Sequence, residues 1–198
     1  MSGAWCDELS FGFGWTEPGF LERTSHALAL GGRVYLFDPL EADGVDYRLA
    51  ALGRPAAVVQ LLGRHRRDCA AFAARLEVPH LCMPRGGLPF DLIPLSQNRF
   101  WTEVAVWAAS ERILLVADAL GSAPYFVVPG ERLAVHPLLR LHQPSALRDV
   151  ATLSPNHVLC GHGAGIHGGE AALALKEALR TARSRIPRYL TGRLRGRR

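Results

Sequence analysis

The stretch from Ala56 to Leu76 limits the possible folds most, because its pattern changes from strand to charged turn to helix. Residues 56–62 are almost all apolar and predict a buried strand. A turn rich in Arg, His and Asp follows, and residues 67–76 have the periodicity of an amphipathic helix. This order places polar side chains at the carboxyl end of a strand, where α/β proteins bind their ligands.

Further strands and helices are predicted on both sides of this stretch. Gly31-Gly32 supplies the positive φ angles of a tight hairpin turn between two apolar runs within residues 25–37. The aromatic run from Phe11 to Trp15 predicts an edge strand, and residues 84–94 predict a loop. The remaining predictions are a hairpin over residues 102–117, helices over 145–153 and 170–185, and a strand over 156–160.

Length and composition favour one folded domain in a soluble protein. The chain has 198 residues, 48% of them hydrophobic, which is enough to bury one core. We expect a single domain over residues 1–187 and a flexible basic tail over 188–198. No apolar run approaches the roughly 20 residues that span a bilayer, and the N-terminus lacks the pattern of a secretory signal. A cytoplasmic location is therefore expected.

The positive charge of the chain is concentrated at its C-terminus. The net charge is +5, and no acidic residue follows Glu177. Such a tail can bind nucleic acid or an anionic surface, but a charge block of this kind is more often only solvated. We favour the solvated end and keep nucleic-acid binding as the weaker alternative. The arginines concerned are Arg180, Arg183, Arg185, Arg188, Arg193, Arg195, Arg197 and Arg198.

Four segments occur in an order that resembles the metallo-β-lactamase fold superfamily over roughly residues 25–185. They are Phe37-Asp38-Pro39, the turn around His65 and Asp68, the run Leu114–Leu120, and the run Pro155–Gly163 before the last helix. The resemblance implies an α/β (α+β) fold, a four-layer αββα sandwich with two mixed β-sheets flanked by helices. It also implies a metal site at one edge, between the sheets.

The metal-binding motif of that superfamily, H-x-H-x-D-H, is degenerate here. With Asp68 on the motif's aspartate, Arg64 and Arg66 stand where the first two histidines belong, and Cys69 stands at the last one. His65 is out of register by one residue. Farther along, Asp118 matches the bridging aspartate of the superfamily and His162 matches its final histidine, while the histidine expected between the two hairpins is missing.

Two interpretations of this pattern stay open. Asp68, Asp118 and His162, with Cys69 as a fourth ligand, offer donors for a single metal ion, most plausibly zinc. The chain would then be a mononuclear hydrolase of an ester, thioester or phosphodiester, with Asp68, Asp118 and His162 at its catalytic centre.

In the other interpretation, positive side chains have replaced the metal. Arg64, His65, Arg66 and Arg67 would neutralise the carboxylates or bind a small anionic ligand. We favour this second interpretation, in which an eroded dinuclear site has lost two-metal hydrolysis and holds no metal or a weakly bound one. Whether the chain is an enzyme is left open.

Overall fold

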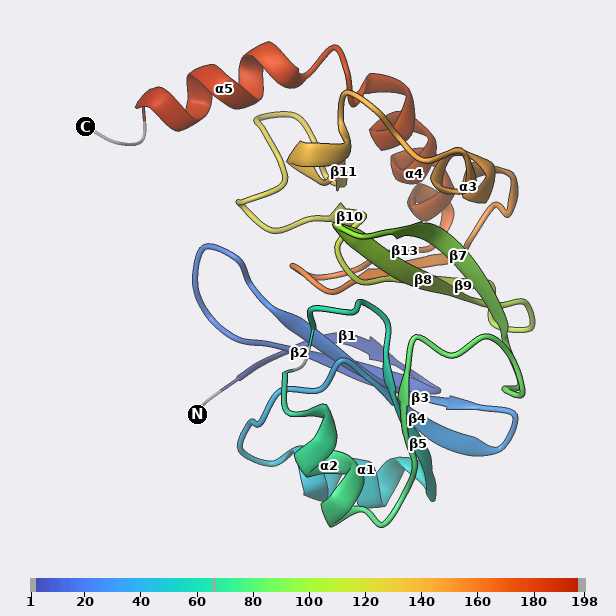
Figure 1. Ribbon diagram of the computed structural model, residues 1–198. Helices are drawn as coiled ribbons and strands as arrows, with labels where there is room; N and C mark the ends of the chain where they lie inside the picture. Colours follow the sequence, from blue (N-terminus) through green and yellow to red (C-terminus); the bar gives the residue numbers. More distant parts are fainter. Residues whose placement is uncertain (1–2, 66, 196–198) are drawn as a thin grey trace.

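The computed structural model describes residues 3–65 and 67–195, and the two β-sheets of this part of the chain face each other. Helices α1 and α2 cover the outer face of the first sheet, and α3 and α4 cover the outer face of the second (Figure 1). The predicted four-layer αββα sandwich is confirmed.

The first sheet is formed by the N-terminal part of the chain in the order β1-β2-β3-β4-β5-β6. Strands β1 to β4 are antiparallel, whereas β5 and β6 run parallel to β4. Gly31 and Gly32, with φ angles of 56° and 75°, make the predicted tight turn between β3 and β4. The strands are β1 (Ala4–Leu9), β2 (Gly12–Thr16), β3 (Thr24–Leu30), β4 (Arg33–Phe37), β5 (Pro55–Gln60) and β6 (His80–Cys82).

The second sheet has the order β13-β12-β9-β8-β7. Only β12 and β9 pair in parallel, so their carboxyl ends lie side by side. The five strands are β7 (Asp91–Asn98), β8 (Trp101–Ala108), β9 (Ile113–Val116), β12 (His157–Cys160) and β13 (Ile166–His167). A separate pair joins β10 (Leu120–Gly121) and β11 (Ala134–Val135).

The helices follow the predicted pattern closely. They are α1 (Val45–Leu52), α2 (Cys69–Arg75), α3 (Ser145–Asp149) and α4 (Gly169–Thr181), with short 3₁₀ turns at Pro137–Leu139 and Val150–Thr152. A further helix, α5 (Ile186–Arg195), includes most of the tail for which we expected flexibility. Pro187 lies in the first turn of α5, where its missing N–H costs no hydrogen bond. None of the helices in the described residues is long and apolar enough to cross a membrane.

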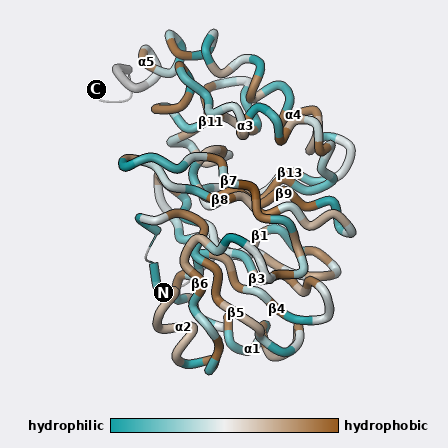
Figure 2. The backbone as a smooth tube through the Cα atoms, turned by 45° about the vertical axis from the view of Figure 1, so that its right-hand side comes forward, coloured by the Kyte–Doolittle hydropathy of each residue, from teal (hydrophilic) through white to brown (hydrophobic). Residues whose placement is uncertain are grey.

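Apolar side chains fill each of the three spaces between the layers. Leu28, Phe37, Val59, Val106 and Leu115 are buried between the two sheets. Separate clusters lie beneath α1 and α2 and beneath α3 and α4. Figure 2 shows the hydrophobic colouring concentrated in the strands at the centre of the molecule. Because both faces of each sheet are covered, the central strands are apolar on both sides.

Two strands differ from the sequence-based expectation. The run from Phe11 to Trp15 lies in β2 from Gly12 onward, and β2 is paired on both sides, so the edge of the sheet is β1 instead. Strand β7 begins at Asp91, inside the segment predicted as a loop, and includes Pro94. A proline fits there because β7 is an edge strand whose register shifts after Pro94.

Candidate metal centre

His65, Asp118 and His162 come together where three loops meet at one edge of the sandwich. His65 follows β5 of the first sheet, whereas Asp118 and His162 follow the neighbouring strands β9 and β12 of the second. One possible ligand atom from each side chain lies within 4.8 Å of the other two. All three side chains are nearly buried, with exposed fractions of 11%, 7% and 8%.

The two imidazoles converge on one oxygen of Asp118. His65 Nε2 lies 2.7 Å from Asp118 Oδ1, and His162 Nε2 lies 3.0 Å from the same oxygen. Despite these distances, Oδ1 is buried without a hydrogen-bond partner among the described residues. The ring nitrogens are therefore close to Oδ1 but not oriented to donate to it. Three possible metal-ligand atoms that lie this close to one another without hydrogen bonds between them are typical of a site for one cation.

The opposite nitrogen of each imidazole is fixed by an oxygen acceptor. His65 Nδ1 lies 3.1 Å from Asp38 Oδ2, and His162 Nδ1 lies 2.8 Å from the carbonyl oxygen of Leu21. A carbonyl can only accept, so Nδ1 of His162 carries a proton, and Nε2 is the ring nitrogen that faces Asp118. Metal-binding histidines are commonly oriented in this way by a carboxylate or a carbonyl. The donor set thus fits a single metal ion.

The charges of the site are strongly coupled. Burial alone would raise the pKa of Asp118, but its contacts with His162 and His65 hold the pKa far below the usual range. Burial and the nearby Arg67 would lower the pKa of His65, but Asp118 and Asp38 outweigh them and raise it. Asp118 is therefore an anion that attracts a cation, whether a metal ion or a proton on the facing imidazole.

Two glycines allow the loop of His162 to approach its neighbours closely. Gly163 has a φ angle of 83°, and a Cβ atom there would lie 2.4 Å from the backbone nitrogen of Ala123. A Cβ on Gly161 would lie 2.5 Å from the carbonyl oxygen of Ala117. The sequence Gly161-His162-Gly163 is therefore needed to place His162 beside the loop that carries Asp118.

Glu103 on β8 fixes the backbone of the Asp118 loop. Its Oε1 accepts hydrogen bonds from the consecutive N–H groups of Ala117, Asp118 and Ala119, at 3.0 to 3.1 Å. Its Oε2 accepts one from the indole of Trp101 at 2.8 Å. Burial and the charge of Asp118 raise the pKa of Glu103 to about 7. Because it is fully buried and bonded, Glu103 supports the site without reaching its centre.

The arginines of the turn have different roles. Arg64 Nη2 lies 2.7 Å from Asp118 Oδ2, and its guanidinium lies 4.3 Å from the centre of the Trp101 ring. Arg67 instead donates from its buried guanidinium to the carbonyl oxygens of Thr24, Asp38 and Gly161. Arg66, which the sequence placed with them, lies outside the described residues. Arg64 alone is therefore seen to pair with the carboxylate of the site.

Two of the predicted ligands lie outside the group of three. Asp68 is the N-cap residue of α2, and its Oδ2 accepts the backbone N–H of Glu41 at 2.7 Å. Cys69 is completely buried against the core beneath α1 and α2, where burial raises the pKa of its thiol to about 12. Cys69 therefore belongs to the core beneath these helices and not to the group formed by His65, Asp118 and His162.

The sequence reasoning missed two carboxylates that support the site. Asp38 ends β4 and orients His65, and its Oδ1 also accepts the N–H of Leu61 at 3.0 Å. Glu103 is a single charged residue within the apolar pattern of β8, which is a signal for a buried functional carboxylate. The carbonyl of Leu21 leaves no signal in a sequence, because every residue has a carbonyl group.

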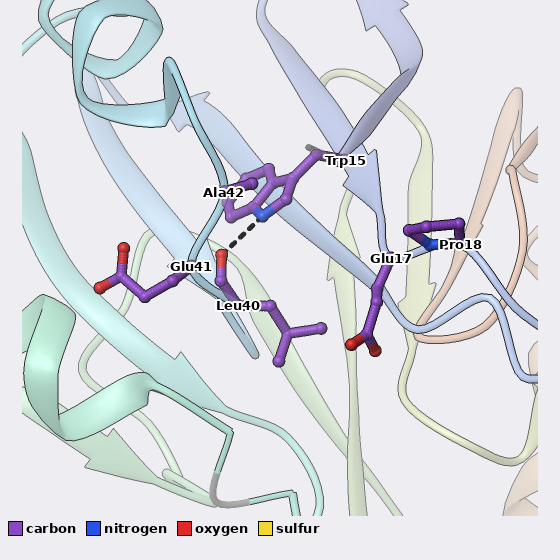
Figure 3. A pocket seen from close by; sticks show the side chains of 7 residues that line it. Trp15, Glu17, Pro18, Leu40, Glu41 and Ala42 are labelled. Atoms are coloured by element: carbon purple, nitrogen blue, oxygen red, sulfur yellow. Dashed lines mark hydrogen bonds between the residues drawn. The ribbon is translucent and has the colours of Figure 1, made fainter. Parts of the chain in front are cut away.

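An apolar pocket of about 450 Å³ lies beside the loop after Asp38, and its lining does not include His65, Asp118 or His162. The indole of Trp15 donates a hydrogen bond to the carbonyl of Leu40 at 2.7 Å, and Figure 3 shows the carboxylates of Glu17 and Glu41 on either side of Leu40. Each carboxylate is paired, Glu17 with Arg23 at 2.5 Å and Glu41 with Arg75 at 2.6 Å. Hence the pocket offers mainly an apolar surface.

Solved structures share this fold at low sequence identity. A metallo-β-lactamase from Pontibacter korlensis aligns with a TM-score of 0.60 and 10% identity, over 90% of this chain and 99% of that one. The protein TTHA1623 in a di-iron-bound form gives 0.52 and 19%, over 78% and 94%. A peroxy diiron species of the chemotaxis sensor ODP gives 0.58 and 14%, over 89% and 94%. No protein-family model and no curated protein matches the sequence significantly.

Proposed function

We propose that this chain, which has the metallo-β-lactamase fold, is a hydrolase that uses one divalent metal ion held by His65, Asp118 and His162. The observation that carries the proposal is the convergence of two oriented imidazoles on Asp118 Oδ1, an oxygen without a hydrogen-bond partner among the described residues. A metal ion bound there would act as a Lewis acid and lower the pKa of a bound water molecule. The expected substrate is an ester, thioester or phosphodiester.

The residues around these donors have supporting roles in the proposed reaction. Asp38 and the Leu21 carbonyl keep the Nδ1 atoms protonated, so that both Nε2 atoms face the centre. Arg64 is 47% exposed and is the cation that an anionic substrate group would meet first. Its guanidinium is stacked on Trp101, and guanidinium groups bind carboxylates and phosphates strongly through paired N–H donors.

A second candidate function is a metal-free protein that binds a small anion. The ion pair between Arg64 and Asp118 favours it, because the guanidinium already compensates the charge of this carboxylate. In this candidate a proton on His65 takes the place of the metal, in line with the raised pKa of its imidazole. Both candidates use the same residues, so metal content separates them.

Elemental analysis of untagged protein, purified without added metal, tests the proposal. We expect about one equivalent of zinc, iron or manganese that is lost in Asp118→Asn and His162→Ala, together with hydrolysis of p-nitrophenyl acetate or bis-p-nitrophenyl phosphate. Asp68→Asn and Cys69→Ser are matched controls that should keep the metal, because both side chains lie outside the group of three. Equal metal content in wild type and Asp118→Asn, before and after incubation with zinc, would overturn the proposal.

A further inference from the structure

Two histidines face each other across β12 and β13, away from the candidate metal centre. His157 and His167 are direct partners in the antiparallel pairing of these strands, and their Nδ1 atoms lie 3.0 Å apart. His157 begins β12, whereas His162 follows the other end of the strand. At roughly 3.3 Å per residue, the two positions are about 16 Å apart along the backbone. This histidine pair is thus separate from the site around Asp118.

A buried carboxylate fixes the protonation of His167. Asp7 Oδ1 lies 2.9 Å from His167 Nε2 and also accepts the N–H of Gly165 at 2.7 Å. The side chain of Asp7 is 1% exposed, yet its hydrogen bonds outweigh burial and keep its pKa far below the usual range. An ionised Asp7 can only accept, so His167 Nε2 carries a proton. The other ring nitrogen of His167, Nδ1, is the one that faces His157.

His157 supplies the second nitrogen. Burial and the neighbouring His167 lower the pKa of His157, which favours its neutral imidazole. Imidazole nitrogens are common ligands of Zn²⁺, Ni²⁺, Co²⁺ and Cu²⁺, and two of them can bind the same ion. For metal–nitrogen bonds of 2.0–2.1 Å, two neighbouring ligands are separated by about 2.9–3.3 Å. The two Nδ1 atoms are hydrogen-bonded at 3.0 Å, within this range, and an ion would take the place of that hydrogen bond.

We propose that His157 and His167 form a second binding site, which holds a borderline divalent transition-metal ion through their two Nδ1 atoms. Asp7 positions His167 from behind, as a carboxylate does for many metal-binding histidines. The side chain of His167 is 34% exposed, so water completes the coordination of the ion. The ion would fasten the short edge strand β13 to β12 and, through Asp7, to β1 of the other sheet.

Calorimetric titration of untagged protein with Ni²⁺ tests this site. We expect His157→Ala and His167→Ala each to lose one equivalent of Ni²⁺, or to bind it at least tenfold more weakly, while His142→Ala behaves as wild type. His142 is a suitable control because it is exposed and has no hydrogen bond or ion pair among the residues that the structure describes. Unchanged Ni²⁺ binding in His157→Ala would overturn the proposal.

Two further measurements distinguish metal binding at the histidine pair from metal binding at Asp118 and from a hydrogen bond between the two rings. In His162→Ala, the Ni²⁺ equivalent at the histidine pair should remain, so that failure of this site and failure of the centre at Asp118 give different patterns. On unmutated protein, substoichiometric Ni²⁺ should broaden the imidazole NMR signals of His157 and His167. If the two rings are only hydrogen-bonded to each other, these signals stay sharp and the proposal fails.

Discussion

At the scale of single residues, Asp7 shows how a buried charge stabilises this fold. Its carboxylate lies near two imidazoles, His167 and His26, with His26 Nε2 at 3.1 Å. Asp7 also has a φ angle of 52°, a conformation that aspartate and asparagine tolerate better than most residues. Asn is therefore a substitute that keeps the backbone and the size of the side chain but removes the charge.

Asp7→Asn should lower the free energy of unfolding by about 2 kcal/mol at pH 7, the usual value of hydrogen bonds to a buried charge. Because the folded state depresses the pKa of Asp7, its contribution is complete above the unfolded value near 4 and is lost as the pH falls through the folded value. The difference in stability between wild type and variant should thus begin to shrink below about pH 4 and continue to shrink as the pH falls further. Urea unfolding at several pH values measures this.

Asp91→Asn is the control for that experiment, since Asp91 is exposed on the edge strand β7. Its stability should follow that of wild type at every pH. A constant difference between Asp7→Asn and wild type from pH 7 to pH 3 would mean that packing, and not charge, explains the effect.

Sequence reasoning could locate Asp118 and His162, because both follow an apolar strand directly and parallel neighbours end at the same edge. It could not predict the conformation of the turn after β5. There the motif alignment assumed the spacing of intact relatives, but the N–H of His65 bonds to the carbonyl of Leu62 in a tight turn. This turn brings His65 into the site and leaves Asp68 as the N-cap residue of α2. A shift of one residue relative to the motif thus makes His65 the candidate ligand from this turn.

At the scale of elements, α4 and α5 show the difference between a helix that builds the core and one that lies outside it. Leu175 and Ala178 of α4 are buried in the cluster beneath α3 and α4. In α5, Leu190 is 57% exposed, and Figure 1 shows the helix at the periphery. The apolar periodicity of α4 predicted its helix, whereas the arginines after Pro187 hid the helical pattern of α5.

A pair of leucine substitutions tests this difference. Leu175→Ala should cost about 2–4 kcal/mol of unfolding free energy, because it leaves a cavity in a closed core. Leu190→Ala should change it by less than about 0.5 kcal/mol, as is usual for exposed positions. Chemical denaturation of both variants measures the difference. Equal losses would show that α5 packs against the domain as firmly as α4 does.

At the scale of the whole molecule, the candidate metal centre connects the two halves of the sandwich. His65 lies in a loop that follows a strand of the first sheet, whereas Asp118 and His162 follow strands of the second. Arg67 also links the two halves without a metal ion, since its guanidinium donates hydrogen bonds to the carbonyls of Thr24 and Gly161. A ligand that binds only the folded state stabilises it by mass action, by about 2.7 kcal/mol at a hundredfold excess over the dissociation constant. An ion at this seam must therefore raise the stability of the entire fold.

Removal of metal should accordingly lower the thermal unfolding midpoint of wild-type protein by roughly 5–10 °C, the shift that 2.7 kcal/mol produces in a domain of this size. His162→Ala should show little further decrease on chelation, because it lacks a complete set of donors. The same midpoints are also measured in variants that carry His157→Ala, so that metal bound by the histidine pair on β12 and β13 does not contribute to the shift. A midpoint that chelation leaves unchanged in metal-containing wild type would mean that the ion binds the unfolded chain as well as it binds the folded one, and the proposed centre between the sheets would be wrong.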